Sequence, residues 1–254
     1  MNNGTVQSLE RGLTILTILA KAGSPMTLND IAASFKIDRS SVFRLIKTMV
    51  KAGFIYQDID TKRYSLGFKV LELAGSFSDN LRLEEFLRPI IKDVCRRTNQ
   101  NTHLAILDRG EVVFIAVEQP RDAITISISI GTRESATQTA LGRAILAFME
   151  ENTIDEIIKI SPLKRYTPKS IISRNQLDST LSGIRDMRLA VDNEEYKPGI
   201  ICFASPVLNH KGQVVCSIGI SGLDRLIMPY YNEYGEAVKE AAIKASALLG
   251  QPVQ

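Results

Sequence analysis

The sequence predicts an α+β protein in two parts: a small helical part that ends in a β-hairpin, and a larger part built on an antiparallel sheet. Between residues 6 and 66, apolar residues recur at helical spacing in three stretches and then alternate with polar residues in two short runs. In the rest of the chain, short alternating runs outnumber the helices that could connect parallel strands. This imbalance favours an antiparallel sheet flanked by helices.

Length and composition set the broad class of the protein. The 254 residues are enough for one large or two ordinary domains. Apolar residues make up 44% and charged residues 23% of the chain, typical globular values that exclude wholesale disorder. No apolar run approaches the ~20 residues that cross a bilayer, and the first residues lack the basic start and apolar core of a signal peptide. We therefore expect a protein of the cytoplasm without membrane contact. Three cysteines, an odd number without a CxxC pair, argue against a disulfide framework.

The first predicted helix spans residues 6–21. Its apolar residues cover more than one side, so we expect it to be buried over much of its surface. The sequence Gly-Ser-Pro at residues 23–25 ends it.

Residues 27–51, TLNDIAASFKIDRSSVFRLIKTMVK, predict two short helices joined by a tight turn. Thr27 and Asp30 have the spacing of a capping box at the start of the first helix. Asp38 can cap the second helix, whose buried stripe would begin at Val42. Because only residues 36–37 separate the two helices, they must cross sharply and share one small core, as in a helix-turn-helix.

The second of these helices has a basic outer face. Residues 36–51 contain five basic side chains and one acidic one. In a helix-turn-helix, the first turns of this helix meet base edges in the major groove of DNA. The candidate DNA-contacting residues on the helix are therefore Arg39, Ser40, Ser41, Arg44 and Lys47. The alternative is a solvated basic face on an ordinary helix pair.

A strand at residues 54–57, a polar turn and a second strand at 63–66 predict a hairpin, the wing of a winged helix-turn-helix. Lys62 and Arg63 lie at its tip or just past it, where they could reach phosphates or a minor groove. Residues 1–80 carry ten basic and seven acidic side chains and thus the whole net charge of +3. That distribution is expected if only this segment approaches a polyanion.

A helical pattern resumes at residue 67 and ends near residue 80. Its apolar stripe needs a partner, either a second copy of the chain or another part of the same chain. A single winged helix reads only a short half-site, so a homodimer would serve tight recognition.

The second part of the chain predicts strands and helices in alternation. We expect helices at 83–98, 139–150, 153–160, 175–188 and 231–249, and strands at 103–107, 112–117, 124–130, 189–193, 200–208 and 213–221. A glycine-marked loop is expected at 131–137.

Several segments together resemble one family. VQSLERGLTILTILA, LNDIAASFKIDRSSVFRLIKTMVKAGFI and RYSLGFKVLELA resemble the N-terminal domain of the IclR-type family of bacterial transcriptional regulators. TALGRAILAF, AVDNEEYKPGIICFASPV and GQVVCSIGISG resemble its effector-binding domain. The resemblance implies a winged helix-turn-helix at residues 1–66, a linker helix at 67–80 and a GAF-like effector-binding domain at 81–254. It also implies dimers that pair into tetramers on DNA, and control of catabolic genes, usually repression, by a small metabolite.

The resemblance further implies a ligand site at Ala140, Leu141, Asp192, Cys202, Gly219 and Ser221. The residue types fit an organic acid, because the free amides at the start of the helix near Thr139 suit a carboxylate and Asp192 can accept from a hydroxyl. Ile126 and Ile128 would supply apolar lining. Related chains often have serine at the position of Gly219, so a glycine there would make room for a bulkier sugar acid or aromatic acid.

Each of these residues also has a structural interpretation. Asp192 could cap a turn, Cys202 could be a small buried apolar residue, and Ser221 could satisfy the end of a strand.

No catalytic, metal or cofactor site is predicted. There is no G-x-S-x-G motif, no phosphate-binding glycine loop and no zinc-ligand spacing, and His103 and His210 make a poor acid/base pair. Glu194 and Glu195 are adjacent, so at most one of them should face inward. Two functions remain: a ligand-responsive DNA-binding repressor or activator, and a winged-helix protein-interaction module with a ligand-free dimerisation domain.

Overall fold

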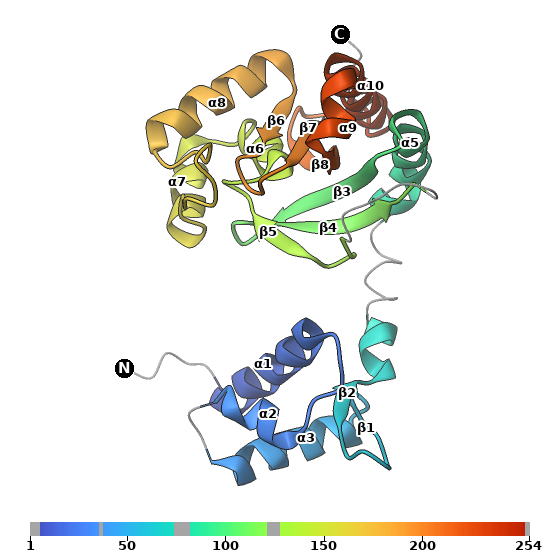
Figure 1. Ribbon diagram of the computed structural model, residues 1–254, viewed down its shortest axis with the longest axis vertical. Coiled ribbons are helices and arrows are strands. Elements are labelled where there is room, and N and C mark those ends of the chain that lie inside the picture. Colours follow the sequence, from blue (N-terminus) through green and yellow to red (C-terminus); the bar gives the residue numbers. More distant parts are fainter. Residues whose placement is uncertain (1–5, 36–37, 74–81, 121–127, 252–254) are drawn as a thin grey trace. The chain divides into compact units, whose positions relative to one another are not determined.

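The computed structural model describes residues 6–35, 38–73, 82–120 and 128–251. These residues form two compact units, Met1–Arg82 and Leu83–Gln254 (Figure 1). The predicted α+β fold class is confirmed. The predicted ends of the linker helix stay a prediction: residues 68–73 are helical, and residues 74–81 lie outside the described residues.

The first unit has the predicted order of elements. Helices α1 (Gln7–Ala22), α2 (Leu28–Ala33) and α3 (Arg39–Lys51) precede the antiparallel hairpin of β1 (Ile55–Gln57) and β2 (Tyr64–Leu66). Gly23 ends α1 in the left-handed conformation, with φ of 61°. The capping box is confirmed, since the Asp30 amide donates to the Thr27 hydroxyl and the Thr27 amide donates to the Asp30 carboxylate.

One apolar cluster holds the first unit together. Its buried side chains are Ile15, Leu19, Ile31, Val42, Ile46, Ile55 and Tyr64, so every element of the unit contributes to it. The prediction that α1 is buried over much of its surface was wrong. Leu9 and Leu13 are 62% and 57% exposed. Only the side of α1 that carries Ile15 and Leu19 packs on the core of this small unit.

The second unit is built on a six-stranded antiparallel sheet in the order β5-β4-β3-β8-β7-β6. The strands are β3 (Asn101–Asp108), β4 (Glu111–Glu118), β5 (Arg133–Ser135), β6 (Ala190–Asn193), β7 (Ile200–Leu208) and β8 (Val214–Leu223). Chain-distant strands meet at its centre, where β3 pairs with β8.

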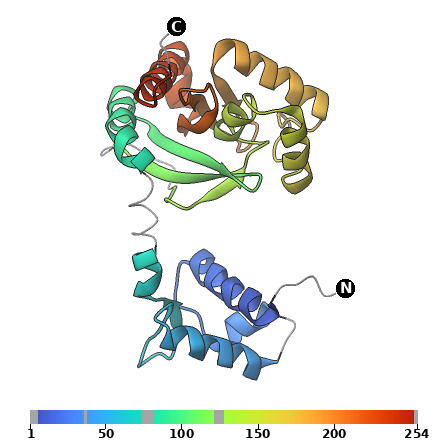
Figure 2. The same ribbon diagram turned by 180° about the vertical axis from the view of Figure 1, so that it is seen from behind.

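Helices cover both faces of this sheet. On one face, α5 (Arg82–Thr98) and α10 (Tyr231–Leu248) pack on a cluster that includes Ile91, Phe203 and Val238. On the other, α6 (Ala140–Leu146), α7 (Glu151–Ile160) and α8 (Arg174–Met187) pack on a cluster that includes Phe114 and Ala204. Seen from behind (Figure 2), the two groups of helices again lie at opposite sides of the unit.

Four details differ from the sequence predictions. The expected strand at 124–130 lies mostly outside the described residues, and residues 128–130 are not a strand. The expected loop at 131–137 contains β5, a short edge strand without an alternating apolar pattern that forms because β4 offers backbone partners. Helix α6 ends at Leu146 instead of residue 150, and the short helices α9 (Asp224–Ile227) and η1 (Met228–Tyr230) were not predicted.

Within the described ranges, no helix is long and apolar enough to cross a membrane.

Candidate functional site

The outer face of α3 is exposed and basic. Arg39, Ser40, Arg44 and Lys47 are exposed, whereas Val42 on the opposite face is fully buried. Arg39 and Lys47 have no hydrogen-bond or ion-pair partner among the residues that the structure describes. Helical periodicity therefore places the predicted candidates together on one accessible surface, with Ser41 half-buried at its margin.

The two serines at the start of α3 are held by Asp38. Its carboxylate accepts from the Ser40 hydroxyl at 2.5 Å and from the Ser41 hydroxyl at 2.8 Å, and also caps the helix by accepting from the Ser41 amide. These hydrogen bonds hold the pKa of Asp38 below its usual range. Arg44 donates through Nη2 to the Ser41 hydroxyl at 3.2 Å. Contacts of either serine to a base would have to share or replace these hydrogen bonds.

The two predicted cations of the wing have different surroundings. Lys62 is exposed at the turn of the hairpin, in the left-handed conformation with φ of 57°. The guanidinium of Arg63 donates through Nη1 to the Pro25 carbonyl at 3.0 Å. Arg63 therefore ties the wing to the segment before α2, although the residue as a whole is still exposed.

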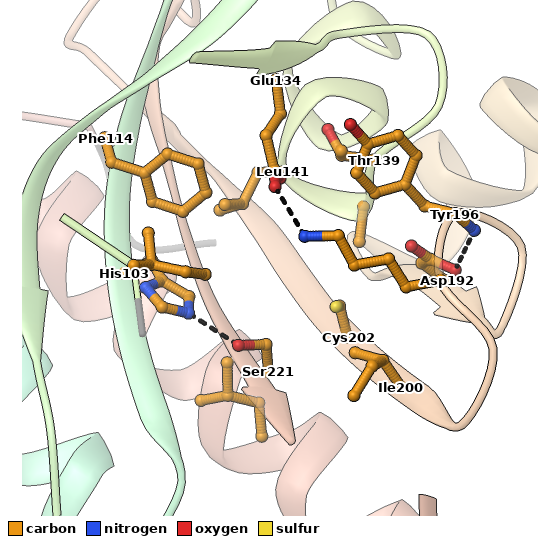
Figure 3. A pocket seen from close by; sticks show the side chains of 14 residues that line it. His103, Phe114, Glu134, Thr139, Leu141, Asp192, Tyr196, Ile200, Cys202 and Ser221 are labelled. Atoms are coloured by element: carbon orange, nitrogen blue, oxygen red, sulfur yellow. Dashed lines mark hydrogen bonds and ion pairs between the residues drawn. The ribbon is translucent and has the colours of Figure 1, made fainter. Parts of the chain in front are cut away.

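The second unit contains a cavity of about 40 Å³ between the sheet and the start of α6 (Figure 3). Most of the predicted ligand residues line it: Ile128, Ala140, Leu141, Asp192, Cys202 and Ser221. The strand register explains the convergence, because Asp192 pairs with Cys202 on the neighbouring strand and Cys202 pairs with Ser221 on the next one. Three residues distant in sequence thus form one row across β6, β7 and β8.

Gly219 lies where α6 packs on the sheet. It is absent from the described lining of the cavity, and an added Cβ would lie 2.5 Å from the Phe203 carbonyl oxygen and 3.0 Å from Cδ2 of Leu141. The glycine lets α6 approach the sheet closely, and its expected effect on the room for a ligand stays a prediction. Ile126 lies outside the described residues.

Asp192 both caps a turn and lines the cavity. Its Oδ1 accepts from the amides of Glu195 at 2.8 Å and Tyr196 at 3.3 Å. Burial raises the pKa of Asp192 to about 6, although Arg143 and these two amides favour the carboxylate. At neutral pH the side chain is therefore mainly an anion that can accept a further hydrogen bond from a ligand.

The structure adds cavity residues that the sequence did not indicate. Nε2 of His103 lies 2.8 Å from the Ser221 hydroxyl, and its ring meets that of Phe114 edge-on at 5.2 Å between centroids. Burial lowers the pKa of His103 to about 3, so the imidazole is neutral at physiological pH. The other added residues are Glu134, Thr139, Tyr196, Lys197, Ile200 and Ile220. Only the pairing of β3 with β8 brings His103 here, and the sequence contains no pattern that predicts that pairing.

One ion pair spans the cavity. Nζ of Lys197 lies 3.4 Å from Glu134 Oε1, and 5.4 Å from the centroid of the Tyr196 ring. Lys197 is the one cationic side chain among the described residues that line the cavity. Near it, the amides of Ala140 and Leu141 have no hydrogen-bond acceptor in the described part of the chain, because the Thr139 hydroxyl caps the amide of Gly142 instead.

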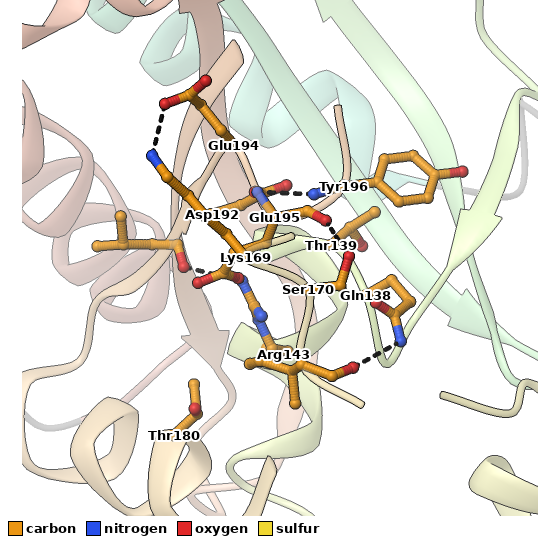
Figure 4. Close-up of polar contacts among 12 residues, drawn as sticks. Gln138, Thr139, Arg143, Lys169, Ser170, Thr180, Asp192, Glu194, Glu195 and Tyr196 are labelled. Carbon is orange, nitrogen blue, oxygen red and sulfur yellow. Dashed lines mark hydrogen bonds and ion pairs between the residues drawn. The ribbon is translucent and has the colours of Figure 1, made fainter. Parts of the chain in front are cut away.

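A buried arginine fastens the turn after Asp192 to α6. Arg143 is fully buried, lies 2.5 Å from Glu195 Oε2 and donates to the Val191 carbonyl at 2.8 Å (Figure 4). Glu194 points outward to Lys169 at 2.6 Å. The expectation that at most one of the adjacent glutamates faces inward is confirmed, although they lie in a turn and not on a strand. The contacts of Arg143 therefore hold the turn after Asp192, which forms one wall of the cavity, against α6, whose first amides face the cavity.

A winged helix-turn-helix whose second helix has a basic exposed face, followed in the same chain by an α+β unit, defines the class of DNA-binding regulators. The sequence matches the family descriptions "IclR helix-turn-helix domain" over residues 8–58 and "Bacterial transcriptional regulator IclR C-terminal" over residues 76–247. The chain belongs to the IclR family of bacterial transcriptional regulators. Proteins of this family are regulators and not enzymes, as the sequence predicted.

Individual relatives extend the likeness over nearly the whole chain. The HTH-type transcriptional regulator XynR of Escherichia coli K12 is 29% identical over 97% of this chain and 98% of its own length. The HTH-type transcriptional repressor AllR of the same strain is 28% identical over 96% of this chain and 90% of its own length. An IclR homologue of Microbacterium hydrocarbonoxydans, solved with 4-hydroxybenzoate, has a TM-score of 0.83 at 22% identity and covers 96% of this chain and 99% of its own. At that identity the last likeness concerns the fold alone.

Proposed function

We propose that this regulator is a repressor of catabolic genes in the cytoplasm and that a small hydroxylated organic acid in the cavity of the second unit changes its affinity for operator DNA. The observation that carries the proposal is the convergence of Asp192, Cys202, Ser221 and the free amides of α6 on one cavity. Repression is supported by the repressor AllR among the relatives.

The cavity groups favour a ligand with a carboxylate and a hydroxyl. The amides of Ala140 and Leu141 and the ammonium of Lys197 suit the carboxylate. Asp192 can accept from one hydroxyl, and Ser221, already bonded to neutral His103, can bind another polar group. The wall between them is apolar, from Phe114, Leu141 and Ile200 among others. An aromatic hydroxy acid or a sugar acid combines these features.

The cavity has to open before it can hold such a ligand. Its volume of about 40 Å³ is far below the 300–1,000 Å³ of typical ligand pockets. The Glu134–Lys197 ion pair and the Tyr196 ring lie where a ligand would have to pass or settle. We propose that this conformation of the cavity is a closed one, and that an acid entering the cavity separates Lys197 from Glu134.

Operator binding is assigned to the face of α3 and to the wing. Arg39, Ser40, Ser41, Arg44 and Lys47 would contact bases and nearby phosphates, while Lys62 and Arg63 would contact the backbone. A homodimer that pairs into a tetramer would read repeated half-sites. Apolar side chains for its pairing are exposed in the first unit, namely Leu9 and Leu13 on α1 and Phe68 and Leu71 at residues 68–73.

A salt-titrated mobility-shift assay tests both units together. The full chain is titrated onto the DNA beside its own gene, with and without 4-hydroxybenzoate, gluconate and pyruvate as probes. We expect specific binding that weakens steeply with salt, because counterions are released from DNA, and a shift in affinity with one of the hydroxylated acids. The alternative, a protein-interaction module, is favoured if folded protein shows no specific DNA binding at any salt concentration. Specific binding that no acid alters would leave the regulator without the proposed effector.

A further inference from the structure

An exposed aromatic side chain lies within the basic face of α3. Phe43 is 45% exposed. The other large apolar residues of the helix, Val42, Leu45, Ile46, Met49 and Val50, belong to the core of the first unit or pack against it, and Phe43 does neither. Packing within this unit therefore leaves almost half of this side chain accessible to solvent.

The neighbours of Phe43 on the helix surface are cations. Arg39, Phe43 and Lys47 follow one another at four-residue intervals, so they lie in one row along α3 with the ring between two positive charges. Neither cation has a partner among the described residues. A row of cation, apolar ring and cation is complementary to a polyanion that offers apolar groups between its charges.

Duplex DNA offers this combination in its major groove. The only apolar group that the four base pairs present there is the C5 methyl of thymine, and phosphates line both edges of the groove. A helix such as α3 fits into the groove, and a phenylalanine side chain can contact the thymine methyl. Desolvation of the ring and the methyl would then favour sequences with thymine at one position.

We propose that Phe43 is a specificity-determining residue of α3 that reads the methyl group of a thymine in each operator half-site. This inference rests on the proposed DNA-binding function and names one base contact within it. Arg39 and Lys47 would hold the two flanking phosphates or base edges and so fix the position of the ring over the base step.

The test uses DNA sites selected from a random library by the full chain. Each thymine of a selected half-site is replaced singly by deoxyuridine, which removes only the C5 methyl, and affinity is measured by fluorescence anisotropy at one salt concentration. At one position we expect the replacement to weaken wild-type binding about fourfold, because burial of one methyl group contributes ~0.8 kcal/mol to the binding free energy. At that position Phe43→Ala should bind the thymine and deoxyuridine sites equally well.

Two further variants separate this contact from general effects. Phe86→Ala removes a ring that is 57% exposed on α5 of the second unit, and it should keep the full deoxyuridine penalty. Phe43→Leu should keep part of it, which also shows that the helix stays folded with a changed residue 43. The slope of log affinity against log salt should be the same for Phe43→Ala as for wild type, and shallower by about one for Lys47→Ala.

Several outcomes would overturn the proposal. One is wild-type binding that is indifferent to deoxyuridine at every thymine, and another is a deoxyuridine penalty that persists in Phe43→Ala. A change in oligomeric state on Phe43→Ala, measured by light scattering without any loss of methyl dependence, would assign the ring to a protein contact instead. If the chain selects no DNA sequence at all, the proposed function itself fails, a result distinct from selected sites that show no methyl dependence.

Discussion

Replacement of Asp192 by asparagine tests whether the cavity is built for a ligand at some cost in stability. The buried carboxyl has a pKa of about 6, raised from the ordinary 3.8 chiefly by burial. Asparagine has nearly the same shape, and its carbonyl oxygen can still accept from the amides of Glu195 and Tyr196. Asp192→Asn therefore removes the buried charge while it leaves the turn capped.

The sign and size of the effect follow from the pKa. Because the pKa is higher in the folded chain, folding favours the protonated carboxyl, so stability falls as pH rises from about 3.8 through about 6. A difference of this size corresponds to about 3 kcal/mol above pH 6, at ~1.36 kcal/mol per tenfold change in proton affinity. Hydrogen bonds from the amides to a neutral oxygen are weaker than to a carboxylate. We therefore expect Asp192→Asn to stabilise the second unit by about 1–3 kcal/mol at pH 7.5.

Urea unfolding followed by circular dichroism between pH 4 and pH 8 measures this difference. The stability advantage of Asp192→Asn should be near zero at pH 4 and should grow through pH 6. Asp186→Asn on the exposed side of α8 is the matched control and should show no such pH dependence. The reasoning is refuted if Asp192→Asn is less stable than wild type at pH 7.5, or if its advantage is the same at every pH. Asp192→Asn should also weaken the response to a hydroxylated acid in the mobility-shift assay.

Three further substitutions probe the reading helix, the buried ion pair and the cavity entrance. Arg44→Ala should weaken specific DNA binding by about 1–3 kcal/mol and leave the affinity of the DNA-free protein for a cavity ligand unchanged; an unaltered gel-shift titration would remove Arg44 from the base-contacting set. Arg143→Met should destabilise the second unit by about 3–5 kcal/mol in urea melts, because Glu195 loses its buried partner. The double variant Arg143→Met/Glu195→Gln should recover much of that loss, and no recovery would contradict the pairing. Glu134→Gln frees Lys197. It should tighten the binding of the acid that shifts operator affinity in the mobility-shift assay about two- to fivefold by calorimetry, the range for a partly exposed ion pair; weaker binding would show that Lys197 does not meet the carboxylate.

Local rules predicted the first unit well because its elements are short and close in sequence. The capping box at Thr27 and Asp30 and the cap at Asp38 need only three residues of context, and the spacing of the basic residues on α3 needs only the helical period. The error at α1 arose because helical spacing shows which residues lie on the same side of a helix, but not how many sides of that helix a small unit can bury. Here only one side of α1 is buried, so Leu9 and Leu13 are apolar and yet exposed.

The cavity could be predicted only in part. Asp192, Cys202 and Ser221 were found through family resemblance, and the register across β6, β7 and β8 explains why they meet. The sequence did not indicate His103, Glu134 or Lys197, because each reaches the cavity through a long-range pairing or a turn. The sequence also did not indicate the packing around Gly219, where an added Cβ would meet Leu141 and the Phe203 carbonyl once α6 packs on the sheet.

By itself the sequence determined the order of elements in the first unit, the antiparallel class of the sheet, the basic face of α3 and the family. These properties depend on composition, on periods of two and 3.6 residues, and on caps and turns that act over a few residues. The tertiary structure decided which polar groups share the cavity, that Asp192 carries a raised pKa, that Lys197 spans the cavity to Glu134, and that Phe43 is left outside the core. Burial and pairing between distant segments are properties of the folded chain as a whole, so no local pattern in the sequence encodes them.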